Sequence, residues 1–429
     1  MTLKQKIDAR TVRIGVIGLG YVGLPLAVEF ARAGFDVTGF DVDDCKVVEL
    51  NAGRSYIGDV STEDLSTHVK AKRLRGTTDM SKLADMDVVD ICVPTPLRKT
   101  KDPDMSYVVA AAEQIAKHLH PGILVVLEST TYPGTTAEVL QPMFEQTGLK
   151  VGEDFYLAFS PERVDPANPQ FNTKNTPKVV GGTTPACSEV AAALYGTAID
   201  TVVPVSSTQV AEMVKLLENT FRAVNIGLVN EMALMAHRMN IDVWEVIDAA
   251  KTKPFGFMPF YPGPGLGGHC IPIDPFYLSW KARQSGFECR FIELAGHING
   301  SMPDFVVERI SEALNTVRKP LNGSKVHIMG VAYKKDVSDM RESPALDVMT
   351  LLEKRGATIS YTDPYVARLE HAGLDLTSVD DKNVKDVDCV VICTNHTAFD
   401  YAGMAKRFPL IVDTRNALKG VDAANVFRL

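Results

Sequence analysis

The stretch VRIGVIGLGYVGLPLAVEFARAGFDVTGFD, residues 12–41, decides the fold. A short β-branched run leads into the pattern Gly18-x-Gly20-x-x-Gly23, which opens a helical pattern, and a second strand-like run then ends in Asp41. The first glycine permits a tight turn, the second lets the backbone approach a pyrophosphate, and the third lets helix and strand pack closely. The order of strand, glycines and helix therefore predicts a dinucleotide-binding βαβ unit rather than a chance glycine-rich turn.

The acid that ends the second strand indicates which dinucleotide binds. Asp41 follows Gly23 by 18 residues, close to the spacing at which a carboxylate accepts hydrogen bonds from the ribose hydroxyls. A carboxylate there repels a 2′-phosphate, so NAD is favoured over NADP. Amides at the helix N-terminus are expected to bind the phosphates.

The amino-acid composition limits which classes of protein the chain can belong to. The chain has 429 residues, 45% hydrophobic and 23% charged, which predicts two or three globular domains. A net charge of −8 argues against a nucleic-acid partner, and no apolar run is long enough to span a membrane. The seven cysteines are scattered without zinc-site spacing, so we expect no metal site and a reducing, cytoplasmic setting.

Three further strand-like runs in the first half end in polar clusters. These are 87–96 with Pro94-Thr95-Pro96, 123–135 with Ser129-Thr130-Thr131, and 155–166 with Ser160-Pro161-Glu162-Arg163. Ligands of open α/β sheets bind beyond the carboxyl ends of strands, so the three clusters are candidates to line one site. Each cluster taken alone is equally consistent with a solvated loop.

Residues 207–240 predict one long helix of about 30 residues, since apolar residues recur at three and four and no proline interrupts them. A helix of this length often joins domains or forms an interface. Lys215 and Asn219 are four residues apart and share one face. Lysine on an amphipathic helix is more often solvated than catalytic, so the spacing alone assigns no role.

Residues 263–275, GPGLGGHCIPIDP, place one cysteine in a glycine-rich loop. Open backbone around Cys270 would allow a substrate to approach the thiol. Asp274-Pro275 predicts a helix start, with aspartate as N-cap and proline at the first helical position. The nearby positive end of the helix dipole favours a thiolate. Asp274 can lie near the sulfur or can only cap the helix, and the residues leave both open.

From about residue 324 the pattern of strands and helices restarts without a Gly-x-Gly-x-x-Gly motif. Basic residues in its first loop, Lys334 and Arg341 among them, suit a phosphate ester or a solvated turn. We therefore predict an α/β protein with two Rossmann-like doubly wound domains joined by a long central helix. The predicted segments are an NAD-binding domain (1–206), a central helical domain with the cysteine loop (207–305) and a C-terminal domain (306–429).

The chain resembles the nucleotide-sugar 6-dehydrogenases of the UDP-glucose/GDP-mannose dehydrogenase superfamily over essentially its whole length. The motifs IGLGYVGLPLA, EMVKLLENTFRAVNI, GPGLGGHCIPIDP and GVAYKKDVSDMRES occur in the family's order. GGHC instead of GGSC, and SPERVDP instead of NPEFLAEG, are similar to the branch acting on UDP-N-acetylhexosamines, and the loops look closest to those acting on UDP-N-acetylglucosamine. The resemblance implies a C-terminal UDP-binding domain, a homodimer or larger homo-oligomer through the long helix, and a product acid for surface polysaccharide.

The resemblance also implies a four-electron oxidation of the sugar C6 alcohol to a carboxylate with reduction of two NAD. An aldehyde has no hydride to give until a nucleophile adds to it, and a thiolate supplies that nucleophile by forming a thiohemiacetal that is oxidised to a thioester. Cys270 would be the nucleophile, Lys215 and Asn219 would stabilise oxyanions, and Asp274 would position water or act as base.

The remaining roles carry over by motif. Thr130 would hold the water and Glu162 would assist hydrolysis, while a second glutamate of the UDP-glucose pattern is replaced here by Pro166. The implied contacts to NAD are Gly18, Gly20, Tyr21, Val22, Gly23, Asp41, Pro94, Thr95, Ser129 and Thr130. The implied contacts to substrate are Arg163, Lys215, Asn219, Gly267, Lys334 and Arg341.

Alternative functions remain at this point. UDP-N-acetylmannosamine, UDP-N-acetylgalactosamine and UDP-glucose are alternative substrates. A two-electron NAD-dependent hydroxy-acid dehydrogenase would use the same first half but needs neither the cysteine loop nor a second nucleotide domain. A non-catalytic NAD-sensing protein would have no need for Cys270, Lys215 and Asp274 together.

Overall fold

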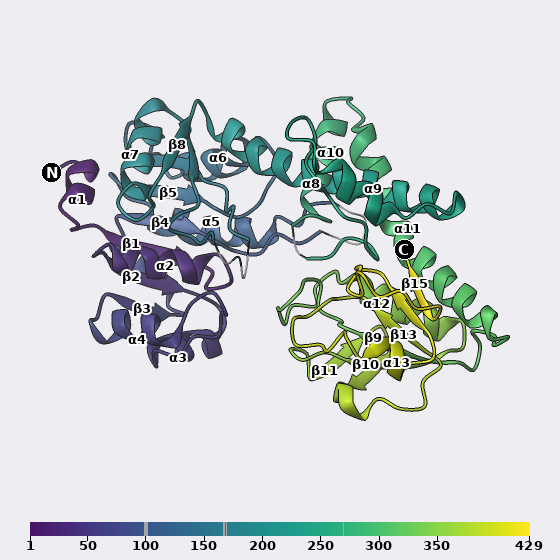
Figure 1. Cartoon of the computed structure of the whole chain (residues 1–429). Helices are drawn as coiled ribbons and strands as arrows, with labels where there is room; N and C mark the ends of the chain where they lie inside the picture. Colours follow the sequence, from purple (N-terminus) through teal and green to yellow (C-terminus); the bar gives the residue numbers. More distant parts are fainter. Residues whose placement is uncertain (98–101, 166–167, 169, 269) are drawn as a thin grey trace. The chain divides into compact units, whose positions relative to one another are not determined.

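The glycine motif lies at the start of a parallel sheet in the computed structural model, which describes residues 1–97, 102–165, 168, 170–268 and 270–429 (Figure 1). The chain forms two units, residues 1–218 with 276–287 and residues 219–275 with 288–429. Both contain a parallel sheet with helices, which confirms the predicted α/β class. No helix in the described ranges combines the length and hydropathy needed to cross a membrane.

The sheet of the first unit has the order β3-β2-β1-β4-β5-β6-β7-β8 among the described residues. Its strands are β1 (Arg13–Ile17), β2 (Asp36–Phe40), β3 (Leu74–Thr77), β4 (Val88–Ile91), β5 (Leu124–Leu127), β6 (Tyr156–Phe159), β7 (Lys178–Gly182) and β8 (Val202–Val205). Neighbouring strands are parallel except that β7 runs antiparallel to β6. The carboxyl ends of β4, β5 and β6 are therefore adjacent, as the sequence predicted.

Helices cover both faces of this sheet. Apolar residues of α1 (Leu3–Asp8), α2 (Gly23–Arg32), α4 (Thr62–Lys70) and α7 (Pro185–Tyr195) share one core with it, and residues of α5 (Ser106–His118) and α6 (Gln141–Glu145) share the other. Helix α3 (Asp44–Asn51) follows β2. Helix α2 ends just before Gly34, which takes a positive φ of 103°.

The second unit repeats the arrangement of the first. Its parallel sheet has the order β10-β9-β13-β14-β15, which matches β2-β1-β4-β5-β6 strand for strand. The strands are β9 (Lys325–Met329), β10 (Thr358–Thr362), β13 (Cys389–Ile392), β14 (Ile411–Asp413) and β15 (Val426–Arg428), and β11 (Arg368–His371) and β12 (Leu374–Thr377) form a separate antiparallel pair. The predicted second Rossmann-like half is therefore confirmed.

The predicted long helix is α8 (Thr208–Arg238), 31 residues in one run. Its residues up to Glu218 belong to the first unit and those from Asn219 belong to the second. Its C-terminal part packs through Val229, Ala233 and Ala236 on α9 (Val243–Ala250). The other helices are α10 (Asp274–Gln284), α11 (Arg290–Thr316), α12 (Pro344–Lys354) and α13 (Met404–Arg407).

Candidate functional site

The three motif glycines have different surroundings. Gly18 has a positive φ of 92°, and a Cβ there would lie 2.5 Å from the carbonyl oxygen of Cys92. A Cβ on Gly23 would lie 1.9 Å from the carbonyl oxygen of Gly18. A Cβ on Gly20 would meet no described atom within 4 Å. The first and third glycines are therefore required by the turn itself, and the open space beside Gly20 fits the approach of a pyrophosphate.

Alanine substitutions should separate these two roles. Gly23→Ala is expected to lower the free energy of unfolding by about 1–3 kcal/mol or more, because its Cβ overlaps a backbone atom. Gly20→Ala is expected to leave that free energy within about 0.5 kcal/mol but to weaken NAD binding. Denaturant unfolding and NAD titration test both variants. Equal destabilisation by the two would contradict the assignment.

Asp41 is buried at the end of β2 and holds the glycine loop. Its Oδ2 accepts a hydrogen bond from Leu19 N at 2.8 Å, and its Oδ1 accepts one from Asp43 N at 3.0 Å. Lys46 Nζ lies 3.2 Å from Oδ2, a partner that the sequence analysis did not identify. Each carboxylate oxygen accepts two hydrogen bonds, so Oδ2 is filled by Leu19 and Lys46, and one acceptor position remains on Oδ1 for a ribose hydroxyl.

Asp41→Ala is expected to raise the NAD dissociation constant roughly 10- to 100-fold, the usual effect of losing a hydrogen bond to a charged group. Asp36→Ala is the control, since Asp36 begins the same strand and pairs with Arg75 at 2.6 Å. Calorimetric titration with NAD gives both constants. Unchanged affinity in Asp41→Ala would remove this carboxylate from the ribose site.

The loop after β5 is fixed to helix α8 by a buried carboxylate. Glu212 accepts hydrogen bonds from Gly134 N at 2.6 Å, Thr136 N at 2.9 Å and Thr136 Oγ1 at 2.7 Å. Burial raises the pKa of Glu212 to about 7 against these hydrogen bonds. One helical turn further on, Lys215 Nζ donates to Thr130 Oγ1. The structure therefore brings together two predicted site residues, Lys215 and Thr130, and Glu212 holds the loop that carries the threonine.

The other predicted residues of the first unit lie at the ends of β4, β5 and β6. Ser129 Oγ donates to Val93 O at 2.7 Å. Thr95 is buried, and its carbonyl accepts from Tyr277 Oη of α10 at 2.7 Å. Pro94 and Tyr21 are exposed, and Val22, the residue before α2, is partly buried.

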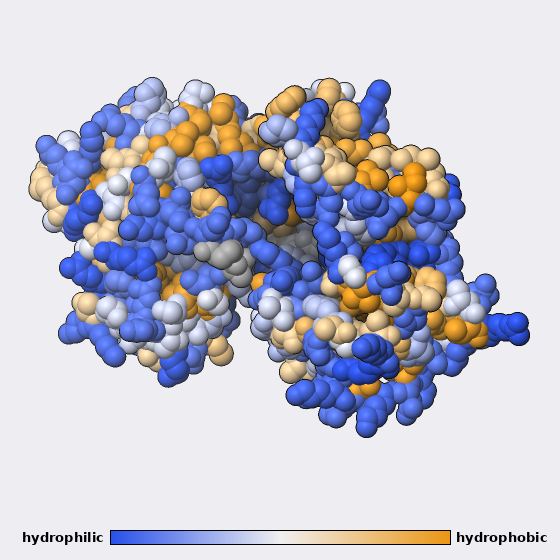
Figure 2. Space-filling view, viewed as in Figure 1, coloured by the Kyte–Doolittle hydropathy of each residue, from blue (hydrophilic) through white to orange (hydrophobic). Residues whose placement is uncertain are grey.

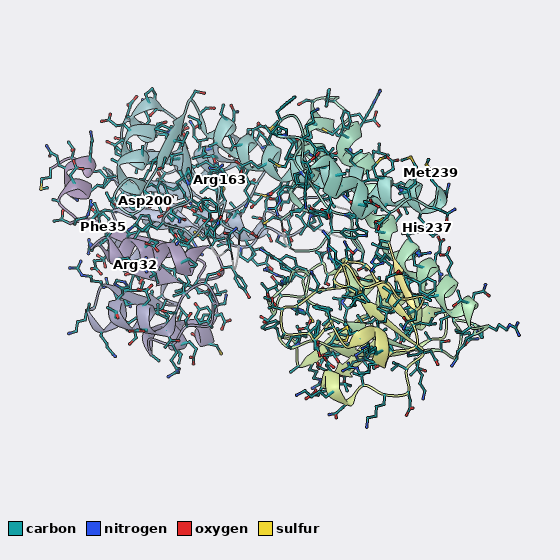
Figure 3. All side chains as sticks on the ribbon, viewed as in Figure 1. Arg32, Phe35, Arg163, Asp200, His237 and Met239 are labelled. Atoms are coloured by element: carbon teal, nitrogen blue, oxygen red, sulfur yellow. The ribbon has the colours of Figure 1, made fainter. Side chains whose placement is uncertain are left out.

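Glu162 and Arg163 follow β6 with different partners. Glu162 Oε1 accepts from the backbone N–H groups of Arg163 and Val164 at 2.8 and 2.6 Å. The guanidinium of Arg163, labelled in Figure 3, donates to Glu218 at 2.6 and 3.2 Å and to Pro177 O at 2.6 Å. A sugar contact from Arg163 would therefore compete with an existing bidentate pair. Pro166 lies outside the described residues.

In the second unit, Asn219 and Asp274 are in contact. Asn219 Nδ2 donates to Asp274 Oδ2 at 2.6 Å, and both side chains are buried. Asp274, the predicted N-cap, is instead the first residue of α10, so the helix starts one residue earlier than the predicted start at Pro275. The backbone N–H groups of Asp274 and Ile273 donate to Cys270 O at 2.8 and 3.1 Å. Cys270 therefore immediately precedes the first turn of α10, as predicted.

No disulfide joins the cysteines of the described ranges. Four of them are buried, Cys92, Cys187, Cys389 and Cys393, and burial raises the pKa of Cys389 and Cys393 to about 12. Cys270 and Cys289 are partly accessible and Cys45 is exposed. Accessibility alone thus leaves three candidates, and the glycine loop distinguishes Cys270.

The cysteine loop packs on the first loop of the second Rossmann-like half. Gly268 N donates to Arg341 O at 3.0 Å. A Cβ on Gly267 would lie 2.8 Å from Tyr333 Cβ and 3.0 Å from Glu342 O. The glycines of this motif therefore permit two loops to meet closely. Within the second loop, the Arg341 guanidinium donates to Asp339 at 2.6 and 3.0 Å, and Lys334 is partly buried.

That second loop is held by a buried pair which the sequence analysis missed. Asp363 ends β10 as Asp41 ends β2, and its Oδ2 accepts from Val331 N at 2.7 Å and from His396 Nε2 at 3.0 Å. Asp336 N donates to His396 Nδ1 at 2.9 Å, which places the ring proton on Nε2. Burial would raise the pKa of Asp363, but these hydrogen bonds keep it below its usual range.

The two halves also share the tight turn after the first strand. A Cβ on Gly330, with φ of 82°, would lie 2.3 Å from Thr394 O, as a Cβ on Gly18 would lie 2.5 Å from Cys92 O. The first half thus has the glycine motif of a dinucleotide-binding fold, and the second half repeats its turn without that motif.

The chain belongs to the UDP-glucose/GDP-mannose dehydrogenase family. The family's NAD binding domain matches residues 12–199, its central domain 209–301 and its UDP binding domain 327–420. The protein is therefore a NAD-dependent nucleotide-sugar dehydrogenase with a UDP-binding domain, as the resemblance implied.

Individual relatives differ in the sugar that their names give. A UDP-N-acetyl-D-mannosamine dehydrogenase of Pyrococcus horikoshii is 36% identical over 423 residues, 97% of this chain and 98% of the relative. A UDP-N-acetyl-D-glucosamine 6-dehydrogenase of Pseudomonas aeruginosa is 35% identical over 397 residues, 92% of this chain and 93% of the relative. A solved structure of the UDP-D-ManNAc dehydrogenase from Pyrococcus horikoshii has a TM-score of 0.89 at 35% identity and covers 97% of this chain and 98% of its own.

Proposed function

We propose that the protein oxidises UDP-N-acetyl-D-glucosamine at C6 to the uronate in a four-electron, NAD-dependent reaction. The observation that carries the proposal is the hydrogen bond from Gly268 N to Arg341 O, which joins the loop of Cys270 to a loop of the UDP-binding domain. A thiol beside the nucleotide-sugar domain suits a reaction that must retain an aldehyde between two oxidations.

Bound NAD supplies the hydride acceptor for each oxidation. Cys270, as thiolate, adds to the aldehyde carbon to form a thiohemiacetal, which becomes a thioester in the second oxidation. Lys215 and Asn219 stabilise the developing oxyanions, and Asp274, fixed by Asn219, positions water or accepts a proton. Thr130 holds the hydrolytic water, and Glu162 accepts its proton.

The choice of sugar rests on GGHC (267–270) and SPERVDP (160–166). The identities of the two relatives above, 36% and 35%, favour neither epimer. UDP-N-acetylmannosamine, UDP-N-acetylgalactosamine and UDP-glucose therefore belong in the same assay, and the product acid would serve the synthesis of a surface polysaccharide.

The test is stoichiometry. The protein is incubated with excess NAD and each UDP-sugar until the sugar is exhausted, and NADH is measured per sugar consumed. Two NADH with UDP-N-acetylglucosamine are expected. Two with another epimer would change the substrate and retain the mechanism. One NADH per sugar would indicate a two-electron dehydrogenase and remove Cys270 from the chemistry.

We also propose that two copies of the chain associate through α8. Phe221, Leu228 and Met235 recur every seven residues and are each about half exposed, at 47%, 51% and 47%. Apolar residues at this spacing form one stripe along a helix. Figure 2 shows apolar surface around α8 and α9. Light scattering should give about twice the chain mass of 46.8 kDa. The Leu228→Asp substitution should reduce the measured mass to that of a single chain.

Residues 1–206, 207–305 and 306–429 would then serve as the NAD-binding, central and UDP-binding segments. Seven scattered cysteines suit a reducing compartment, so we propose a cytoplasmic location for the enzyme.

A further inference from the structure

A cluster of charged side chains is buried in the sheet of the first unit, beside Glu162. Lys178 begins β7, Glu128 follows β5, Asp90 lies within β4, and Tyr195 ends α7. Lys178 is 5% exposed, Glu128 1%, and Asp90 and Tyr195 are fully buried. Charges so far from water must be compensated by one another. The mechanism described above assigns nothing to these four residues.

Lys178 is shared between two carboxylates. Its Nζ lies 2.7 Å from Glu128 Oε2 and 3.5 Å from Glu162 Oε2. The other oxygen of Glu162 is fixed by the backbone N–H groups of Arg163 and Val164. Glu162 is thus oriented from one side by backbone and from the other by a buried ammonium.

The far side of the cluster holds a proton. Tyr195 Oη lies within hydrogen-bond distance of both Glu128 Oε1 and Asp90 Oδ1, the latter at 2.8 Å. A phenol has one hydrogen, so both contacts are hydrogen bonds only if one carboxyl is protonated and donates to the phenol oxygen. Asp90 is that acid, since Glu128 is paired with Lys178. Burial raises the pKa of Asp90 well above its usual value.

With Asp90 neutral, two carboxylates and one ammonium remain charged. Glu128 is oriented by Tyr195 and holds Lys178, so Lys178 cannot turn wholly toward Glu162. The other charged or titratable groups near Glu162 are the buried thiol of Cys92 and the Arg163–Glu218 pair, which is internally balanced at 2.6 Å. Lys178 is therefore the cation that faces Glu162, and it is shared with Glu128.

We propose that Lys178, held by Glu128, is a positioning residue that places its ammonium beside Glu162 and aligns this carboxylate to accept a proton during hydrolysis of the Cys270 thioester. The inference rests on the proposed role of Glu162. In this step a water O–H bond breaks and its proton passes to Glu162, while the water oxygen bonds to the thioester carbon. The C–S bond then breaks, and Cys270 leaves as thiolate.

Two variants test the proposal: one removes the cation beside Glu162 together with its partner, and the other removes the partner alone. Lys178→Met/Glu128→Gln removes the ion pair with side chains of similar size and leaves Glu162 without its cation. Glu128→Gln alone leaves Lys178 with Glu162 as its one anionic partner. The measured quantity is the rate at which the Cys270 thioester is lost in a single turnover. Intact-protein mass spectrometry monitors this loss at pH values from 5 to 9.

The acidic limb of this pH profile reports protonation of Glu162, and Glu162→Gln should abolish it. Lys178 lies nearer to Glu162 than Glu128 does, so removal of the pair favours protonation there; the double variant should move the limb upward, with roughly tenfold slower hydrolysis at pH 6. Glu128→Gln should move the limb downward. Arg309→Met/Glu312→Gln, which removes an ion pair from α11, should retain the wild-type limb.

A merely structural role for the cluster predicts lower thermal stability with the limb unmoved in every variant, and this result would overturn the proposal. Should the double variant fail to fold, Glu128→Gln decides alone by the direction of its shift. If the wild-type protein yields two NADH per sugar and the limb does not move in the variants, the role of Lys178 is rejected and the proposed function is retained. Wild-type protein that forms no thioester rejects both.

Discussion

Cys270→Ser is expected to lower the rate of uronate formation by at least about 10³-fold, because a serine hydroxyl at its ordinary pKa is almost entirely protonated and adds poorly to an aldehyde. The reaction should yield at most one NADH per sugar, and hydrated aldehyde should accumulate. Chromatography with mass spectrometry of the UDP-sugars measures both aldehyde and uronate.

Cys289→Ser is the matched control for this result. Cys289 is also partly accessible, and it lies directly before a helix, α11. It lacks the glycine-rich approach, so its variant should retain two NADH per sugar. Uronate formation by Cys270→Ser at the wild-type rate would rule out the covalent mechanism. Loss of activity in Cys289→Ser would show that the nucleophile is Cys289 and not Cys270.

Lys215→Met should reduce kcat roughly 10²- to 10³-fold with little change in the dissociation constant for NAD, the usual effect of losing a donor that stabilises an oxyanion. Lys215 is buried and its Nζ donates to Thr130 Oγ1, so the variant also frees the hydroxyl proposed to hold water. Steady-state kinetics measures the change in kcat, and NAD titration measures the change in the dissociation constant for NAD.

Lys251→Met serves as the control for Lys215→Met, since it removes an ion pair with Asp248 at 2.6 Å that has no part in the proposed chemistry. It should retain the wild-type kcat. A Lys215→Met variant that lost affinity for NAD but retained kcat would place this lysine in the cofactor site instead of the oxyanion site.

The parts of the fold with local signals were predictable from the sequence. The βαβ unit is predictable because the glycine motif, Gly34 and Asp41 lie close together in the chain. Helix α8 is predictable because apolar residues recur at helical spacing with no proline among them. Strands β7 and β8 were missed, because they are short and end in glycines or contain Pro204, which resemble turns. The antiparallel direction of β7 depends on pairing with β6 and has no local signal.

The candidate site divides in the same way. Cys270 and Asp274 are marked by unusual residues around them, so a motif identifies them. Glu212 and Lys178 are ordinary charged residues within apolar runs, and their partners Gly134 and Glu128 are 78 and 50 residues away. A charge in a buried run is the one available signal, and it predicts a partner without saying which residue it is.

The pair of His396 and Asp363 has a consequence for how fast and how tightly a nucleotide can bind. Backbone N–H groups at both ends of the loop 331–336 are already bonded to this pair, so the loop has one shape before any ligand arrives. A flexible loop would lose conformational entropy when a nucleotide binds. This loop has already lost that entropy during folding. Association with a nucleotide should therefore be a one-step encounter, with an observed rate that rises linearly with ligand concentration and does not level off.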